Sequence, residues 1–323
     1  MGPISTAPAI AGPRGSSDEA RLNGRGPADP PFVSIIIAVR NGAATLQRCL
    51  DSVLAQTFNA WELIVVDGNS SDGTLDLLKS YSGRIHYWVS EPDAGIYAAW
   101  NKALTKTRGT WICFLGADDS FARADVLELM VEHLTAAEGN VRVVYGSVNV
   151  VDESGAVLTT IGQAWPSVRA VFRDHMAIPH QGVFHHRSLF DDHGHFDEGY
   201  RICGDYEFLL RELVEHDASF VPELVVVCMG SGGLSSRPDS LPTVVRELDR
   251  ARRAHGLTRR PELLSGRLWR ALSRVWLTRA LGPKAAETAA RGYRFFARKP
   301  RQPARYDGHR PRESVKKGPE SRL

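Results

Sequence analysis

Residues 32–39, Phe-Val-Ser-Ile-Ile-Ile-Ala-Val, form an almost unbroken run of apolar residues, many of them β-branched. A run of this kind is typical of a strand buried on both faces, as in a parallel sheet covered by helices. Similar short apolar runs return at 61–66 and 111–115, and the segments between them show helical spacing of their apolar residues. The alternation predicts an α/β fold with a mostly parallel central sheet flanked by helices.

The remaining elements follow from the same periodicities. Residues 152–155, Asp-Glu-Ser-Gly, predict a hairpin turn into a strand at 156–161, so we expect a smaller antiparallel portion to begin there. Asn41 precedes the first helix and is expected to cap it. The further expected elements are helices at 44–56, 75–81, 96–107, 124–137, 206–214 and 241–254, and strands at 85–89, 141–150 and 219–228.

The net charge of +3 is unevenly distributed along the chain. Residues 246–323 contain 22 basic and 7 acidic residues, whereas the rest contains 18 basic and 30 acidic ones, which gives net charges of +15 and −12. Within the basic part, residues 267–280 predict an amphipathic helix with Arg on one face and Leu and Trp on the other, inside a helical tail at 257–299. Such a tail binds an anionic membrane surface or packs on the acidic body. Nucleic-acid binding is not expected, because no recognised module accompanies the charge.

Both ends of the chain are expected to be disordered. Residues 1–31 are rich in Gly, Pro, Ser and Ala without a hydrophobic period, and 300–323 are polar and charged. No apolar run reaches the ~18 residues of a membrane span, and no signal-peptide segment is evident. The 4 cysteines are widely spaced in apolar surroundings, which favours free thiols in a reducing compartment. These features predict a cytoplasmic protein, peripheral on the inner face of the plasma membrane if the tail binds lipid.

Two adjacent carboxylates, Asp118 and Asp119, follow the strand at 111–115. Ligands of α/β sheets bind just beyond the carboxyl ends of the strands, and hard divalent cations prefer oxygen ligands. The pair therefore indicates a site for a divalent cation that also binds phosphate oxygens. The alternative is a solvated loop in which an aspartate caps the next helix.

A second polar segment, residues 67–74, follows the strand at 61–66. The turn after the first strand, residues 38–43, carries neither the Gly-x-Gly-x-x-Gly pattern of dinucleotide-binding sheets nor a Walker-type phosphate loop. A bound nucleotide would therefore be held by side chains and a metal ion. Asp72 is expected to cap the helix that begins near Thr74.

The second half of the chain contains another group of polar candidates. Asp205 lies where a helix begins, so it is either an N-cap or a placed general base. Glu207 and Arg211 are four residues apart, which fits a simple ion pair on one helix face as well as contact with a substrate. His180 is either a histidine of the core or a residue of the site.

Four sequence blocks, at 33–41, 65–74, 109–119 and 204–211, together resemble the family 2 glycosyltransferases. These are nucleotide-sugar-dependent enzymes with an A-type glycosyltransferase fold. A further segment, Ser-Glu-Pro-Asp-Ala-Gly-Ile-Tyr at 90–97, resembles the subgroup of colanic-acid-type and other exopolysaccharide or glycolipid transferases. Each block alone is weak evidence, but their common order makes a specific joint signal.

The resemblance implies a glycosyltransferase domain at 32–256, with a nucleotide-sugar half at 32–120 and an acceptor half at 121–256, followed by C-terminal helices. It implies that Asp205 is the catalytic base. The family's roles, transferred to matching positions, place Ala38, Arg40, Asp67, Asp93, Gly95 and Asp118 at the donor, Asp119 with Asp118 on Mg²⁺ or Mn²⁺, and His180, Gln181 and Glu207 on the acceptor side.

The chain also departs from the family pattern. Members often carry a second acid after the second strand, where this chain has Gly68, and some carry a late His ligand, where it has Cys228-Met229-Gly230. The third metal ligand is therefore open, with His180 or water as candidates. The Gln-x-x-Arg-Trp motif of processive synthases is missing, which implies transfer of a single sugar.

The resemblance thus implies an inverting, non-processive, metal-dependent transfer of one sugar from a nucleotide-diphosphate sugar to a hydroxyl of a lipid-linked or cell-surface glycan or glycolipid, as in exopolysaccharide or cell-envelope biosynthesis. One alternative is a noncatalytic, nucleotide-sugar-binding scaffold protein of a polysaccharide assembly complex. Another is a sugar-nucleotide pyrophosphorylase, whose Gly-rich basic signature is not found at 38–43.

Overall fold

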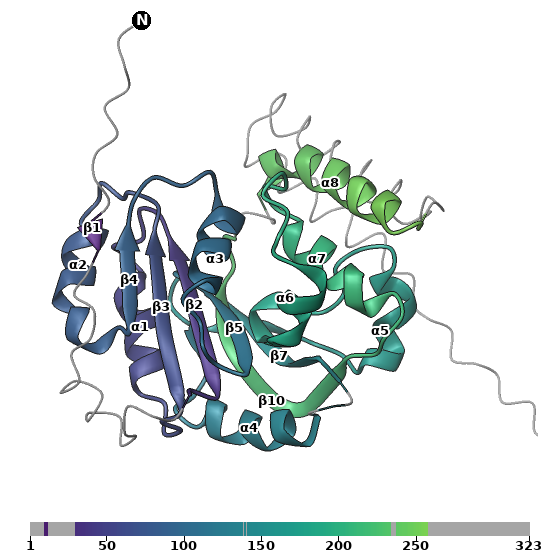
Figure 1. Cartoon of the computed structure of the whole chain (residues 1–323), viewed down its shortest axis with the longest axis horizontal. Helices are drawn as coiled ribbons and strands as arrows, with labels where there is room; N and C mark the ends of the chain where they lie inside the picture. Colours follow the sequence, from purple (N-terminus) through teal and green to yellow (C-terminus); the bar gives the residue numbers. More distant parts are fainter. Residues whose placement is uncertain (1–9, 12–29, 138, 140, 234–236, 258–323) are drawn as a thin grey trace, which may run out of the picture. The chain divides into compact units, whose positions relative to one another are not determined.

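The structure, a computed structural model, describes residues 10–11, 30–137, 139, 141–233 and 237–257 (Figure 1). The predicted basic tail after Leu257 and the predicted disordered end at 300–323 lie outside the described residues, as does most of 1–31. Two leader residues correct the prediction of disorder, because β1 (Ile10–Ala11) pairs antiparallel with β4 (Tyr87–Ser90). An edge strand has unpaired backbone groups that a passing segment can bind.

The first half of the sheet consists of parallel strands in the order β4-β3-β2-β5. Their bounds are Val33–Val39 for β2, Trp61–Asp67 for β3 and Trp111–Gly116 for β5. In β2, Ile35 and Ile37 belong to the core on one face of the sheet and Ile36 to the core on the other. Burial on both faces explains the unbroken apolar run, and the predicted parallel α/β sheet is confirmed.

The second half of the sheet is mixed. β9 (Val183–His186) lies antiparallel between β5 and β7 (Val143–Val151), and β10 (Ser219–Gly230) pairs parallel with β7. The short strand β6 (Ser120–Phe121) pairs antiparallel with β10. The predicted hairpin is confirmed, because β8 (Val157–Ile161) pairs antiparallel with β7.

Helices cover both faces of the sheet, and each face has its own hydrophobic core (Figure 1). Large apolar side chains contribute about 1.5–3 kcal/mol each when fully buried, so the two cores supply the main stabilisation. The helices of one core are α1 (Leu46–Leu54), α2 (Thr74–Ser80) and α4 (Val126–Ala137). Those of the other are α3 (Ile96–Leu104), α5 (Trp165–Phe172), α6 (Ser188–His193), α7 (Gly204–Leu213) and α8 (Leu241–Ala254).

Besides β1, the strands β6 and β9 and the helices α5 and α6 were not expected from the sequence. β9 is only four residues long and contains two histidines, so its apolar pattern is weak. The expected cap at Asn41 is wrong, because the residue that precedes α1 is Thr45. None of the helices within the described ranges is both long and apolar enough to cross a bilayer.

Candidate active site

The turns after β2 and β3 are hydrogen-bonded to each other at the carboxyl edge of the sheet. The Asn41 N–H donates to Ser70 Oγ at 2.7 Å, and the Ser71 N–H donates to Asn41 Oδ1 at 2.9 Å. Asn41 has φ of 54°, a left-handed conformation that asparagine tolerates better than most residues. Asp72 Oδ1 accepts the Thr74 N–H at 3.1 Å, but the N-cap of α2 is Gly73, so the expected cap at Asp72 is wrong by one position. These hydrogen bonds hold the turn after β2 and the turn after β3 in fixed positions relative to each other.

Asp67 is buried at the end of β3. Its Oδ2 accepts the Ser70 N–H at 3.1 Å and the Ser90 hydroxyl at 2.6 Å, and its Oδ1 accepts the Ser70 hydroxyl. The carboxylate therefore joins the ends of β3 and β4 and is held in one orientation.

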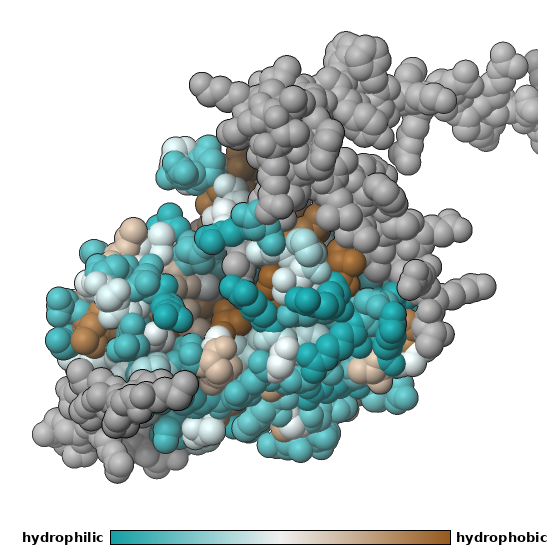
Figure 2. Space-filling view, turned by 90° about the horizontal axis from the view of Figure 1, so that it is seen from above, coloured by the Kyte–Doolittle hydropathy of each residue, from teal (hydrophilic) through white to brown (hydrophobic). Residues whose placement is uncertain are grey.

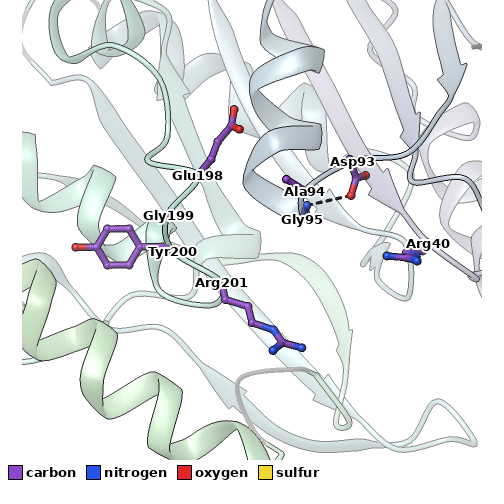
Figure 3. A pocket seen from close by; sticks show the side chains of 8 residues that line it. All are labelled: Arg40, Asp93, Ala94, Gly95, Glu198, Gly199, Tyr200 and Arg201. Atoms are coloured by element: carbon purple, nitrogen blue, oxygen red, sulfur yellow. Dashed lines mark hydrogen bonds between the residues drawn. The ribbon is translucent and has the colours of Figure 1, made fainter. Parts of the chain in front are cut away.

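Asp93 lies in the loop between β4 and α3, close to Gly68. Its Oδ1 accepts the Gly95 N–H at 3.0 Å (Figure 3). A Cβ on Gly68 would lie 2.7 Å from Asp93 Oδ2, so the Asp93 carboxylate lies where a side chain at position 68 would begin. Gly95 has φ of 138°, a conformation that favours glycine, and it starts α3.

Asp118 and Asp119 converge after β5. A Cβ on Gly116 would lie 2.4 Å from Asp119 Oδ2 and 3.0 Å from Asp118 Oδ1, so both carboxylates reach the same side of that residue. Asp119 is buried and Asp118 is exposed. Burial, and then the charge of Asp118, raise the pKa of Asp119 to about 7. Two close carboxylates of this kind are stabilised together by a cation.

The donor set at this pair fits Mg²⁺ or Mn²⁺, because Mg²⁺ commonly binds one or two carboxylates together with substrate phosphates and water. Among the described residues, no group of three or more His, Cys, Asp or Glu could hold a metal ion. His180 therefore does not complete the site as a third ligand in this part of the chain. Gly230, at the end of β10, instead approaches the pair, and its N–H lies 3.4 Å from Asp119 Oδ1.

His180 belongs to the core. Its ring stacks on Trp100 and Phe114, with centroid distances of 5.3 and 5.8 Å. Burial lowers the pKa of His180 to about 3, so the ring is neutral at physiological pH. Gln181 is half-buried in the same short turn, His180–Gly182. The core alternative holds for His180.

Asp205 lies in the first turn of α7, whose N-cap is Cys203, so the N-cap alternative is wrong. Its Oδ1 accepts the Tyr206 N–H at 2.9 Å and lies 3.3 Å from the Tyr97 hydroxyl. Burial raises the pKa of Asp205 to about 6. A carboxylate with this pKa accepts a proton more readily than an ordinary aspartate and is still ionised at neutral pH.

Glu207 forms the ion pair that its spacing allowed. Arg211 Nη2 donates to Glu207 Oε2 at 2.6 Å, and His255 Nε2 lies 3.0 Å from Oε1. Burial acts to raise the pKa of Glu207, but these hydrogen bonds lower it overall. The carboxylate is occupied by two partners within the protein, which gives no support to its expected place on the acceptor side.

A cavity of ≈ 460 Å³ lies between the turn after β2, the start of α3 and the loop before α7 (Figure 3). The guanidinium groups of Arg40 and Arg201 enter it from its two sides (Figure 3). Within the described ranges, neither group forms an ion pair, and both line the cavity. The remaining lining residues are Asp93, Ala94, Gly95, Glu198, Gly199 and Tyr200.

The loop that carries Arg201 is held by α8, which sequence reasoning did not foresee. Glu247 accepts the N–H groups of Arg201, Ile202 and Cys203 at 2.8–2.9 Å. Arg250 lies over the Tyr200 ring, 4.1 Å from its centroid. The sequence signal for Arg201 was its position four residues before Asp205. The surface seen in Figure 2 is mostly hydrophilic where it is not grey.

The comparisons with known proteins agree with this arrangement. The family model described as "Glycosyl transferase family 2" matches residues 34–186. A "PGL/p-HBAD biosynthesis glycosyltransferase" of Mycobacterium bovis is 35% identical over 184 residues, 56% of this chain and 69% of that protein. The "Putative teichuronic acid biosynthesis glycosyltransferase TuaG" of Bacillus subtilis is 37% identical over 107 residues, 32% of this chain and 42% of that protein.

Solved structures share the fold at low sequence identity. The mannosyltransferase PcManGT of Pyrobaculum calidifontis, in complex with GDP-Man and Mn²⁺, has a TM-score of 0.55 and 18% identity, covering 88% of each chain. S. aureus TarS 1-349, in complex with UDP-GlcNAc, has a TM-score of 0.52 and 17% identity, covering 68% of this chain and 66% of that chain. The order of strands, the polar carboxyl edge, the family match and these relatives lead to one conclusion. The chain belongs to glycosyl transferase family 2 and is a glycosyltransferase with the A-type fold.

Proposed function

We propose that the protein transfers one sugar, with inversion and without processivity, from a nucleotide-diphosphate sugar to a hydroxyl of a lipid-linked or cell-surface glycan or glycolipid. The observation that carries the proposal is Asp205. It is a half-buried carboxylate with a pKa raised to about 6, and it lies in the first turn of the helix that follows the cavity-lining residue Arg201. The segment just before this helix, residues 198–201, lines the cavity, and we therefore place the acceptor hydroxyl near Asp205.

The donor half would bind the nucleotide. Asp67 is pre-oriented by its two serines and would accept hydrogen bonds from the base, and Ala38 and Arg40 would flank the nucleotide at the end of β2. Asp93 and Gly95 would approach the donor from the loop between β4 and α3. Arg40 and Arg201, which both line the cavity, would attract the diphosphate through their positive charges.

Asp118 and Asp119 would hold the divalent cation. When bound, Mg²⁺ or Mn²⁺ supplies Lewis-acid stabilisation of the charge that develops on the leaving diphosphate. Asp119 is buried, so the attraction between its negative charge and a bound cation would be stronger than it is in water. The structural neighbour PcManGT has been solved with GDP-Man and Mn²⁺, which supports a metal-assisted reaction here.

Asp205 would remove the acceptor's proton. The acceptor oxygen bonds to the anomeric carbon as the bond from that carbon to the diphosphate oxygen breaks, and the acceptor proton passes to the Asp205 carboxylate. General-base catalysis of this kind contributes roughly 10²–10⁴-fold. Attack from the face opposite the leaving group in one displacement inverts the anomeric configuration.

The acceptor class rests on the relatives. Their names refer to biosynthesis of PGL/p-HBAD and of teichuronic acid. We therefore extend the proposal to a cell-envelope acceptor on the inner face of the plasma membrane, with the basic tail, which lies outside the described residues, binding anionic lipid. Gln181 would lie on the acceptor side, beside the core histidine His180.

The decisive experiment is a donor screen with Mn²⁺ across UDP-, GDP- and dTDP-sugars, followed by acceptor identification and NMR of the product's anomeric configuration. The proposal expects hydrolysis or transfer with one donor class and an inverted product. A retained configuration would overturn the inverting mechanism. Nucleotide-sugar binding without hydrolysis or transfer would favour a scaffold protein, and formation of a nucleotide sugar from sugar phosphate would favour a pyrophosphorylase.

A further inference from the structure

The hydroxyl of Tyr97 bonds to the N-terminus of α7, more than a hundred residues away in the sequence. Tyr97 lies in the first turn of α3 and is 3% exposed. Its O–H donates to the Ile202 carbonyl oxygen at 2.6 Å and lies 3.3 Å from Asp205 Oδ1, and its oxygen accepts the Gly204 N–H at 2.8 Å. One hydroxyl thus contacts three residues of the segment that carries Asp205, namely Ile202, Gly204 and Asp205 itself.

The Tyr97 ring is packed as closely as its hydroxyl is bonded. A Cβ on Gly204 would lie 2.8 Å from two ring carbons, so α7 approaches the ring at a distance that only glycine permits. On its other sides the ring contacts Trp100 and Phe196, with centroid distances of 5.4 and 5.7 Å. The position of the hydroxyl is therefore set by the packing of the ring in the core.

Tyr97 also follows the cavity-lining loop directly. Gly95, two residues earlier, bonds through its N–H to Asp93, and both residues line the cavity. A single turn of chain thus contacts the proposed donor through residues 93–95 and the proposed base through Tyr97. Among the described residues, the Tyr97 hydroxyl is the only side-chain group that hydrogen-bonds to the Asp205 carboxylate.

We propose that Tyr97 is a positioning residue, which fixes the start of α7 and orients the Asp205 carboxylate toward the acceptor hydroxyl. This inference rests on the proposed role of Asp205 as base. Burial raises the pKa of Tyr97 well above its ordinary value, so the hydroxyl keeps its proton and remains a donor. Tyr97 is not itself a proton carrier in this scheme.

Several other groups face Asp205 and act on its charge. The Tyr206 N–H stabilises the carboxylate, whereas the negative charge of Glu247, on α8, disfavours it. Cys203, the N-cap of α7, is a neutral thiol because burial raises its pKa. The Tyr97 hydroxyl lowers the pKa of Asp205, so its removal shifts that pKa upward while the other groups stay in place.

The test is Tyr97→Phe, which keeps the ring and its packing and removes only the hydroxyl. We expect kcat to fall roughly 10- to 100-fold, the loss typical of a slightly misplaced catalytic group. The Kd of the nucleoside diphosphate should stay within about twofold, because the variant leaves the donor contacts intact. The acid limb of the pH profile of kcat/KM should move to higher pH. Unchanged kcat with an unchanged acid limb would overturn the inference.

Tyr206→Phe is the matched control. Tyr206 is adjacent to Asp205 and buried, and its hydroxyl donates to the Phe172 carbonyl oxygen at 2.9 Å, away from Asp205. Tyr206→Phe loses one buried hydrogen bond and Tyr97→Phe loses the three contacts of its hydroxyl, so the Tm of each variant is measured beside its kinetics. Only Tyr97→Phe should change the acid limb. Equal kinetic losses in both would show that stability alone is responsible and would contradict a positioning role.

A second readout separates this inference from the proposed function. The carboxyl carbon of Asp205 is titrated by ¹³C NMR in the wild type and in Tyr97→Phe, without substrate. A higher pKa in the variant supports the contact even if no donor is turned over, in which case only the proposed function fails. An identical pKa in both proteins overturns the inference, whatever the activity.

Discussion

The Asp93 carboxylate and Gly68 lie so close that a methyl group on Gly68 would come within 2.7 Å of Asp93 Oδ2. Gly68 follows β3 and Asp93 follows β4, so the two neighbouring strand ends share one carboxylate. The Asp93 carboxylate therefore occupies the space that the side chain of a second acid at position 68 would need.

Gly68→Ala should weaken donor binding without unfolding the protein. The new methyl group must displace the Asp93 carboxylate, which is the movable end of a side chain. The substitution should therefore change the shape of the cavity that Asp93 lines rather than unfold the protein. We expect the Kd of the nucleoside diphosphate to rise roughly fivefold or more, consistent with an overpacking cost of about 1 kcal/mol. Isothermal titration calorimetry measures it. Gly232→Ala is the control, because nothing lies within 4 Å of its Cβ position.

Asp205→Asn should reduce turnover and increase stability at neutral pH. The folded pKa of about 6 lies above the ordinary value of 3.8, so ionisation of Asp205 destabilises the folded state as the pH rises through 6. Asparagine removes this effect, and the gain in Tm should appear at pH 8 and vanish near pH 4, at roughly 2–4 °C for each kcal/mol. kcat should fall roughly 10²–10⁴-fold. Wild-type turnover in the variant would exclude Asp205 as the base.

Asp119→Asn should abolish stabilisation by Mn²⁺. In the metal-free protein the variant should be at least as stable as the wild type, because Asp119 is buried beside the charge of Asp118. Addition of Mn²⁺ with a nucleoside diphosphate should raise the Tm of the wild type by mass action but not that of the variant. Differential scanning fluorimetry with and without EDTA checks this. An equal Mn²⁺ shift in both proteins would place the metal elsewhere.

Arg201→Ala should weaken binding of the nucleoside diphosphate by roughly tenfold, as expected for one charge-assisted contact of about 1.5 kcal/mol. The remaining affinity should depend less on salt. Arg253→Ala is a suitable control, because Arg253 pairs with Asp249 on the exposed side of α8. If both variants bind the nucleotide as the wild type does, Arg201 does not contact the diphosphate.

The sequence was most informative where residues contact their near neighbours. The run in β2 predicted a strand buried on both faces, and the acids after β3 and β5 were predicted at the carboxyl edge because parallel strands end at the same side. Hydrogen bonds between distant segments could not be predicted in this way. Tyr97 and Gly204, or Glu247 and Cys203, pair only because α3, α7 and α8 pack on the same face of the sheet.

His180 shows the opposite limit. A histidine in a polar-looking segment gives no signal that its ring will stack on Trp100 and Phe114 in a dry core. Glu207 was equally ambiguous, since the same spacing to Arg211 serves an ion pair or a substrate. Only the three-dimensional contact with His255 decides that its carboxylate is occupied.

The bonds from Glu247 set a lower limit on how far this enzyme can be shortened. Residues 201–203 donate three N–H groups to one carboxylate on α8, and Arg250 on the same helix pairs with Asp197 at 2.6 Å. A truncation that removes α8 would remove the hydrogen bonds that hold the cavity-lining residue Arg201 and the residues just before α7. Crystallisation and expression trials that trim the C-terminus should therefore end after Leu257 and not at the last strand of the sheet.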